Sequence, residues 1–144
     1  MTKKVKHDRG GVRPRAPHLA LGAEGEERAA RFLARRGYRI VGRNVRAGGV
    51  EIDIVARRGA CIVFVEVKTR RSRRFGGPEE AVGPAKQRRL VRAAGAWLRD
   101  HDARARSTRF DVIAVLAAEP DRAGASRWQI RHIRAAFDAS QGGD

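Results

Sequence analysis

Apolar residues recur at helical spacing in an early stretch of the chain. Residues 21–38, LGAEGEERAARFLARRGY, place Ala29 and Leu33 on one face of a helix, with acidic residues in the first turn. Gly37 follows as a stop signal. The pattern predicts a helix over about residues 22–36.

A second helical pattern follows a basic stretch rich in Gly and Pro. Pro84 suits the first position of a helix, where the missing N–H costs nothing. The expected helix carries one face made of Leu90, Ala94, Trp97, Leu98 and His101. We therefore expect it to pack against a sheet.

β-Branched and aromatic residues in short runs predict strands. The first three lie one after another, at residues 38–46, 50–58 and 60–70. Gly48-Gly49 and Gly59 stand between them at turn positions, which favours an antiparallel meander. A fourth strand is expected at 108–117 and an edge strand at 126–137.

The order of these elements is α-β-β-β-α-β with a possible extra edge strand, which predicts an α/β fold with a mixed β-sheet flanked by helices. The chain of 144 residues is the size of one ordinary domain. We expect a disordered basic arm over residues 1–18, one domain over 19–137 and a flexible tail over 138–144.

The charge of the chain points to its partner. Lys and Arg number 32 against 16 Asp and Glu, a formal net charge of +16 with a pI near 11.6. Such a positive field attracts polyanions, so nucleic acid is the expected partner. The apolar runs, such as Ala60–Val65, are too short to span a membrane, and no apolar segment follows the basic start of the chain. A cytoplasmic protein is expected.

Charged residues interrupt two of the apolar strands. In the second strand, alternation places Ile52 and Ile54 on one face, with Glu51, Asp53 and Val55 on the other. The two carboxylates are therefore expected as a pair on the same face.

In the third strand both faces begin apolar, which predicts a central strand covered on both sides. One face holds Cys61, Val63, Val65 and Val67, and the other Ile62, Phe64, Glu66 and Lys68. Charges on such a strand lie either at its rim or in the interior, where they need a partner or a metal.

Hard oxygen ligands from neighbouring strands offer a chemical explanation for these charges. Asp53, Glu66 and the carbonyl oxygen of Val67 suit Mg²⁺, with water completing an octahedron. Lys68 lies on the same face as Glu66, where it could hold a water for attack on a phosphodiester. The alternative is a salt-bridge cluster that solubilises the end of a sheet.

The first helix offers one further carboxylate. Glu24 and Glu27 each have an arginine four residues on, Arg28 and Arg31, so surface ion pairs account for both. Glu26 instead continues the apolar face and could reach the metal or its water. A favourable interaction with the helix dipole is the alternative role.

Glu26, Asp53 and the EVK of residues 66–68 resemble the PD-(D/E)xK nuclease superfamily, whose Holliday junction resolvase members carry a Glu on the first helix. A closer resemblance is to the YraN-like family, the bacterial uncharacterised protein family 0102. Seven blocks carry it, GAEGEERAARFL, GYRIVGRN, GGVEIDIVA, FVEVKTR, FGGPEEAV, KQRRL and RFDVIAV.

The resemblance implies a restriction-endonuclease-like core with a Mg²⁺ (or Mn²⁺) site at Asp53, Glu66 and Lys68, to which Glu26 is carried over. Ile52 stands where the superfamily often has Pro. Gln87 lies where several related nucleases place a helix-two Gln and, with Lys86, could face the phosphate, although a solvated helix face is as good an account. Asp111 belongs to the family pattern but suits a buried structural pair equally well.

Cationic and polar residues after the third strand and on the second helix would contact phosphates. The expected nucleic-acid-binding set is Arg70, Arg71, Arg73, Arg74, Lys86, Gln87, Arg88, Arg89 and Arg92. Only 6% of residues are aromatic and no RNA-binding aromatic pattern is present, so DNA is favoured over RNA.

Three functions remain open on the sequence. The first is a metal-dependent endonuclease that acts on DNA, including branched or structured nucleic acid. The second is a non-catalytic nucleic-acid-binding module that retains the nuclease fold. The third is a basic adaptor at anionic membranes or on the ribosome. A homodimer is compatible with the first, since cutting two strands symmetrically needs two sites.

Overall fold

The computed structural model of the chain describes residues 17–71, 82–101, 105–118, 120–125 and 127–139. The remaining residues, which include most of the expected arm and tail, lie outside this description. The elements in order are α1 (Pro17–Arg35), β1 (Arg39–Ala47), β2 (Val50–Arg58), β3 (Cys61–Arg70), α2 (Pro84–Asp100), β4 (Ser107–Ala117) and β5 (Trp128–Phe137).

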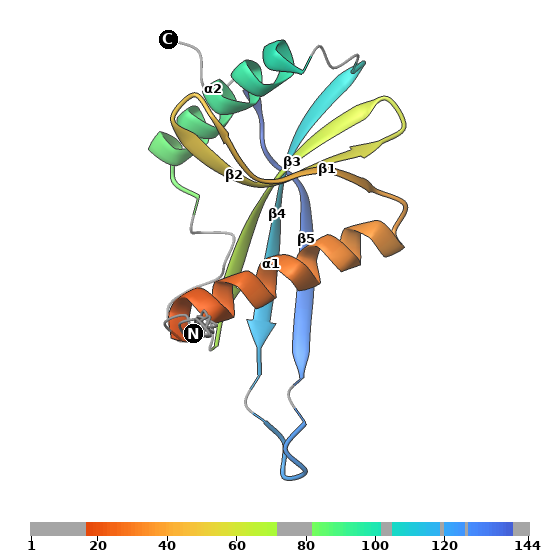
Figure 1. Ribbon diagram of the computed structural model, residues 1–144, viewed down its shortest axis with the longest axis vertical. Coiled ribbons are helices and arrows are strands. Elements are labelled where there is room, and N and C mark those ends of the chain that lie inside the picture. The colour runs from red at the N-terminus through yellow and green to blue at the C-terminus, as the bar shows by residue number, and fades with distance from the viewer. Residues whose placement is uncertain (1–16, 72–81, 102–104, 119, 126, 140–144) are drawn as a thin grey trace, which may run out of the picture.

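The five strands form one mixed sheet in the order β1-β2-β3-β4-β5 (Figure 1). Strands β1, β2 and β3 are antiparallel neighbours, and β4 and β5 are also antiparallel. The pairing of β3 with β4 is parallel, and α2 makes the crossover between them. The predicted α/β fold, its meander and its edge strand are confirmed.

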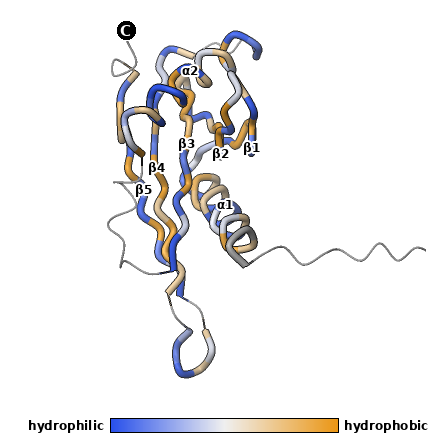
Figure 2. The backbone as a smooth tube through the Cα atoms, turned by 90° about the vertical axis from the view of Figure 1, so that its left-hand side faces the viewer, coloured by the Kyte–Doolittle hydropathy of each residue, from blue (hydrophilic) through white to orange (hydrophobic). Residues whose placement is uncertain are grey.

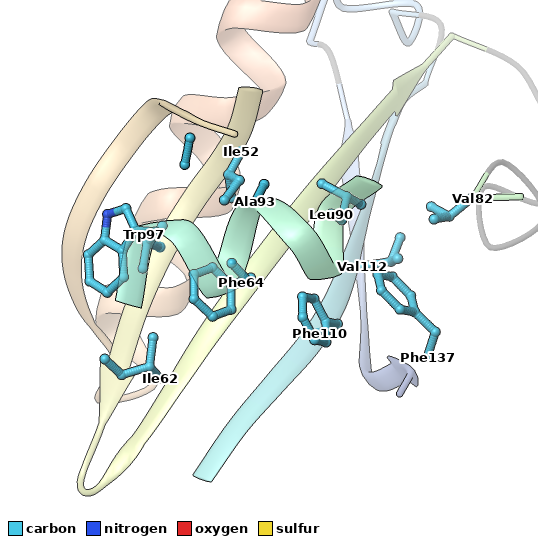
Figure 3. Close-up of a cluster of buried hydrophobic side chains, with 13 residues drawn as sticks. Ile52, Ile62, Phe64, Val82, Leu90, Ala93, Trp97, Phe110, Val112 and Phe137 are labelled. Atoms are coloured by element: carbon cyan, nitrogen blue, oxygen red, sulfur yellow. The ribbon is translucent and has the colours of Figure 1, made fainter. Parts of the chain in front are cut away.

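The helices cover opposite faces of the sheet (Figure 2). Helix α1 packs Ala29 and Leu33 against Val63 and Val65 of β3. Helix α2 covers the other face, where Trp97 meets Phe64 edge to face (Figure 3). Strand β3 is therefore central and buried on both sides, as its sequence predicts.

The expected alternation in β2 is wrong at its first half. Ile54 packs under α1 as part of one core cluster, whereas Ile52 lies in the cluster under α2, together with Val55. The turn between β1 and β2 curls onto α2, where the Cβ position of Gly48 is 3.5 Å from the Ala93 Cα. This bend turns Ile52 toward α2, so Ile52 and Ile54 do not share a face.

Helix α1 begins earlier than its sequence indicates, at Pro17, and ends at Arg35. Proline suits the start of a helix, and Gly37, with a φ of 86°, follows its end. Within the helix, Gly25 touches β3: an added Cβ would lie 1.9 Å from the Thr69 Oγ1. Only glycine allows this approach. No helix in the described ranges is long and apolar enough to cross a membrane.

Candidate active site

Strands β2 and β3 part near the middle of the sheet. Their pairing ends at Ile54 opposite Val65, while β3 continues alongside β4 as far as Arg70. Asp53 is the first residue of β2 beyond this pairing, and the Val67 amide donates a hydrogen bond to its Oδ2 at 2.8 Å. We call the opening between Asp53 and Val67 the fork.

Glu66 is the second carboxylate at the fork. Its side chain is only 8% exposed, and it lies on the α2 side of β3. Lys68 Nζ, from the same strand, lies 3.3 Å from its Oε1, and Lys86 from α2 donates to the same oxygen. The two predicted residues Glu66 and Lys68 are thus brought together, with Lys86 as a further partner.

Glu26 reaches the fork from α1, held by a residue of β1. With the nitrogen of its amide turned toward the carboxylates, Asn44 donates to Glu26 Oε2 at 3.0 Å and to Glu51 Oε1 at 3.1 Å. Asn44 has a φ of 48°, a left-handed conformation that Asn tolerates better than most residues. The predicted position of Glu26, on the inner side of the helix, is confirmed.

Two carboxylates of the fork, Asp53 and Glu26, have a raised pKa. Burial raises the pKa of Asp53 to about 7, and the neighbouring charge of Glu66 adds to the effect against the opposing hydrogen bond from Val67. Burial also raises the pKa of Glu26, and Glu51 and Glu66 contribute in the same direction. Negative charge at the fork is therefore incompletely compensated by the protein, despite the overall positive charge.

The two lysines respond to this environment in opposite ways. Burial and the hydrogen bond with Lys86 lower the pKa of Lys68. Burial acts to lower the pKa of Lys86 as well, but the hydrogen bond and attraction of Glu66 outweigh it and leave that pKa raised. Lys86 is thus the firm counter-charge of Glu66, and Lys68 the lysine that loses its proton more readily.

The protein atoms available to a cation are two carboxylates and main chain. In the described part of the chain, no group of three or more His, Cys, Asp and Glu side chains is arranged to hold a metal ion. Asp53 and Glu66 are close enough for their charges to interact. Mg²⁺ is commonly bound by one or two carboxylates with water and substrate phosphates, so this pair fits it.

The residues expected to contact nucleic acid fall into several groups. Gln87 donates to the carbonyl oxygen of Val82 at 2.9 Å, which ties the start of α2 to the preceding segment. Arg73 and Arg74 lie outside the described residues. The remaining arginines are exposed at Arg71, Arg88, Arg89 and Arg92, and half-buried at Arg70.

A second buried carboxylate lies on β4. The Asp111 side chain is fully buried and accepts hydrogen bonds from Arg109 at 2.8 Å and from the Ala135 amide at 3.0 Å. His132 Nε2 lies 2.6 Å from Asp111 Oδ2, and Arg109 also donates to the hydroxyl of Tyr38. Of the two roles left open for Asp111, these bonds support the structural one.

The contacts of three of these residues could not be predicted from the sequence. Asn44 lies in the GRN of a family block, and its left-handed backbone is visible only in the fold. His132 stands alone in the sequence. Only the pairing of β4 with β5 brings it to Asp111. The sequence predicts that Lys86 faces the phosphate, and its contact with Glu66 depends on how α2 crosses the sheet.

Comparison with known proteins identifies the family. The model of the uncharacterised protein family UPF0102 matches residues 25–115. A UPF0102 protein of Chlorobaculum tepidum is 50% identical over 81% of this chain and 91% of its own length. Another, of Beutenbergia cavernae, is 51% identical over 80% of this chain and 93% of its own.

A third relative, a UPF0102 protein of Anaeromyxobacter dehalogenans, is 47% identical over 83% of this chain and 84% of its own length. Among solved structures, the one described as the crystal structure of SSO0001 has a TM-score of 0.37 and 18% identity, over 87% of this chain and 56% of that chain. The family match covers Glu26, Asp53, Glu66 and Lys68. The chain belongs to the uncharacterised protein family UPF0102, the YraN family.

Proposed function

We propose that this protein is a Mg²⁺-dependent endonuclease, able to use Mn²⁺, that hydrolyses phosphodiester bonds in DNA, with branched or structured nucleic acid among its candidate substrates. The observation that carries the proposal is the state of Asp53. Burial and the charge of Glu66 raise its pKa to about 7, although the Val67 amide donates a hydrogen bond to its carboxylate. Strongly perturbed acids of this kind are typical of functional sites.

A divalent cation would relieve the repulsion at the fork. Asp53 and Glu66 would hold it with their carboxylates, and the main-chain carbonyl of Val67 is the expected third ligand. When bound, Mg²⁺ supplies a Lewis acid that polarises the phosphate and makes a water more acidic.

The side chains around the fork would do the rest of the chemistry. Lys68, whose pKa is lowered by burial and by Lys86, would hold the attacking water at Nζ and neutralise charge that develops on the phosphate. Glu26, fixed by its hydrogen bond from Asn44, would orient the same water. Lys86 would hold the Glu66 carboxylate in place through their ion pair.

The cationic residues beside the fork would bind the DNA backbone. Arg70 and Arg71 follow Lys68 along the chain, and the exposed arginines of α2 lie on the same side of the sheet as Glu66. Phosphate contacts of this kind are independent of base sequence and sensitive to salt. They position a substrate without selecting it.

One observation favours the alternative of a non-catalytic nucleic-acid-binding module. Glu66 already has two lysine partners of the protein's own, one of them Lys86 with a raised pKa. In a module without a metal, these ion pairs would be the permanent state of the fork. The alternative predicts DNA binding that salt weakens and that metal ions leave unchanged.

Cleavage of labelled linear, flapped and four-way-junction DNA in Mg²⁺, Mn²⁺ or EDTA tests the proposal. We expect metal-dependent cutting of at least one substrate by the wild type. Glu66→Ala and Lys68→Ala should each lower the rate by at least about 100-fold, because each removes a group that acts on the reacting phosphate. Asp53→Ala should abolish cutting while DNA binding is kept.

Glu24→Gln is the matched control, since Glu24 is a carboxylate of α1 that pairs with Arg28 at the surface. Its cleavage rate should equal that of the wild type. Binding without cutting, the same in EDTA and in all variants, would reject the endonuclease and leave the binding module.

A further inference from the structure

A hollow of about 320 Å³ lies between helix α1 and strand β5, on the face of the sheet opposite α2. It is lined by Arg28, Arg31, Phe32, Arg35, Arg36 and Ile130. We call it the α1–β5 groove. None of its arginines belongs to the predicted nucleic-acid-binding set, and the proposed hydrolysis does not use them.

The arginines form a row because of their spacing. Residues three, four and seven apart lie on one side of a helix, so residues 28, 31 and 35 follow the same flank of α1, and Arg36 comes directly after the end of the helix. At 1.5 Å per residue, the helical part of the row, from Arg28 to Arg35, is about 10 Å long. A row of this length suits an extended polyanion better than one small anion.

Aromatic rings orient two of the guanidinium groups without neutralising them. The guanidinium carbon of Arg28 lies 4.2 Å from the centre of the Trp128 ring, and that of Arg36 lies 4.2 Å from the centre of the Phe32 ring. Stacking on a ring leaves the edges of the guanidinium available to donate hydrogen bonds.

The charge of the groove is compensated at one end only. Arg28 pairs with Glu24 at 3.1 Å and Arg31 with Glu27 at 3.2 Å. Within the described ranges, neither Arg35 nor Arg36 has a carboxylate within ion-pair distance. Positive charge therefore accumulates toward the C-terminal end of α1, where the helix dipole also favours cations.

We propose that the α1–β5 groove binds the phosphate backbone of a nucleic acid strand, in addition to the contacts expected from α2. The planar guanidinium group of an arginine can donate two parallel hydrogen bonds to a phosphate. The apolar side chains of Phe32 and Ile130, which also line the groove, suit the sugar face of the strand. The groove is a hollow of about 320 Å³, whereas a membrane presents a broad surface. Binding here requires no cleavage, so it does not depend on the proposed hydrolysis.

The consequence is a basic surface on each side of the sheet. Helix α1 lies across one face and α2 across the other (Figure 1). A protein with both surfaces can contact two segments of nucleic acid at once. Loss of the α1–β5 groove should therefore weaken the binding of a four-way junction more than the binding of a linear duplex.

The test is a fluorescence-anisotropy titration of a labelled duplex and a labelled four-way junction in EDTA, at several salt concentrations. The variant is Arg35→Gln with Arg36→Gln, which leaves no carboxylate of the described residues without its ion-pair partner. We expect the Kd to rise by about tenfold and the slope of log K against log salt to fall by about 1 to 2, since each lost phosphate contact lowers it by about 0.9.

The control removes the same charge elsewhere, as Arg39→Gln with Arg46→Gln. Both arginines are exposed on β1, at the sheet edge opposite β5. This variant should change the Kd by less than about threefold and leave the slope unaltered. An unaltered slope for the groove variant, or an equal loss in the control, would overturn the proposal.

Two further arms keep the result decisive. Arg35→Lys with Arg36→Lys retains the charge but loses the planar guanidinium groups. Its affinity for DNA should therefore fall between those of the wild type and the Gln variant. The Lys variant also replaces the Gln variant in the test if the latter does not fold. Vesicles of phosphatidylserine and phosphatidylcholine test the other polyanion. Vesicle binding that is lost in the groove variant while DNA binding is kept would assign the groove to a membrane instead.

Discussion

Asp53 and Asp111 lie on the two strands that flank β3, and the protein surrounds them in opposite ways. Asp111 is fully buried and is met by Arg109, His132 and a main-chain amide. Burial acts to raise its pKa, but these hydrogen bonds outweigh burial and lower it. Asp53 accepts a hydrogen bond from the Val67 amide, yet burial and the charge of Glu66 raise its pKa to about 7.

The contrast separates a carboxylate whose charge the fold compensates from one whose charge it leaves partly uncompensated. A buried charge with a full set of partners rigidifies its surroundings, whereas a surplus of like charge destabilises them until something binds. The β4 network joins Tyr38, Arg109 and His132 across distant parts of the chain. The fork instead gathers carboxylates whose repulsion a cation would relieve.

The largest expected effect is the loss of Asp111. Asp111→Ala would leave the half-buried Arg109 side chain without its carboxylate and remove the acceptor of His132. We expect it to lower the free energy of unfolding by roughly 3 to 5 kcal/mol, the usual result of removing one partner of a buried ion pair. Urea denaturation measures the loss. A change below about 1 kcal/mol would refute the structural role of Asp111.

Gly25→Ala tests how closely α1 must approach the fork. The added Cβ would lie 1.9 Å from the Thr69 Oγ1 and 2.8 Å from the Thr69 Cβ, so α1 or β3 must shift at this contact. We expect a loss of roughly 1 to 3 kcal/mol in the free energy of unfolding. Gly22→Ala on the same helix meets nothing within 4 Å and should gain up to about 1 kcal/mol. Equal effects of the two substitutions would contradict the close packing at Thr69.

The smallest expected effects compare two residues with nearly the same backbone. Asn44, with φ 48°, serves the fork, and Ala135, with φ 49°, serves the Asp111 network through its amide. Glycine adopts this conformation freely, so Ala135→Gly keeps its hydrogen bond and should gain up to about 1 kcal/mol. Asn44→Gly removes the bridge to Glu26 and should lose about 1 kcal/mol. Thermal unfolding of both variants checks the sign, and a gain for Asn44→Gly would show that the bridge is not stabilising.

Much of the fold could be predicted because its signals are local. The alternation in β3 and the helical spacing of Leu90, Ala94 and Trp97 reflect burial against immediate neighbours, and the structure confirms both. The phase of β2 could not be predicted, since it depends on the curl of the β1–β2 turn onto α2. That contact is long-range and leaves no periodic trace.

The candidate site divides along the same line. Glu26, Glu66 and Lys68 could be placed from helix and strand geometry together with the family resemblance. The partners that set their charge could not, because Lys86 and Asn44 come from other elements. Such partners decide whether the negative charge of a carboxylate is compensated, and with it the role that the carboxylate can play.

A matched pair of aspartate-to-asparagine variants tests the central claim most directly. The measurement is the free energy of unfolding of the wild type, Asp53→Asn and Asp111→Asn in urea, with EDTA, at pH 5 and pH 8. The pKa of Asp53 rises from 3.8 to about 7 on folding. Protonated Asp53 therefore contributes to the free energy of unfolding in acid, and this contribution is lost as the pH rises through about 7. The pKa of Asp111 is lowered, so its contribution is complete above about 4 and is lost only in acid.

We therefore predict that Asp53→Asn is more stable than the wild type at pH 8, by on the order of 1 kcal/mol or more, and that this gain shrinks at pH 5. Asp111→Asn should be less stable than the wild type by a similar amount at both pH values. A loss of stability in Asp53→Asn at pH 8, comparable to that in Asp111→Asn, would contradict the account, because both carboxylates would then serve the fold.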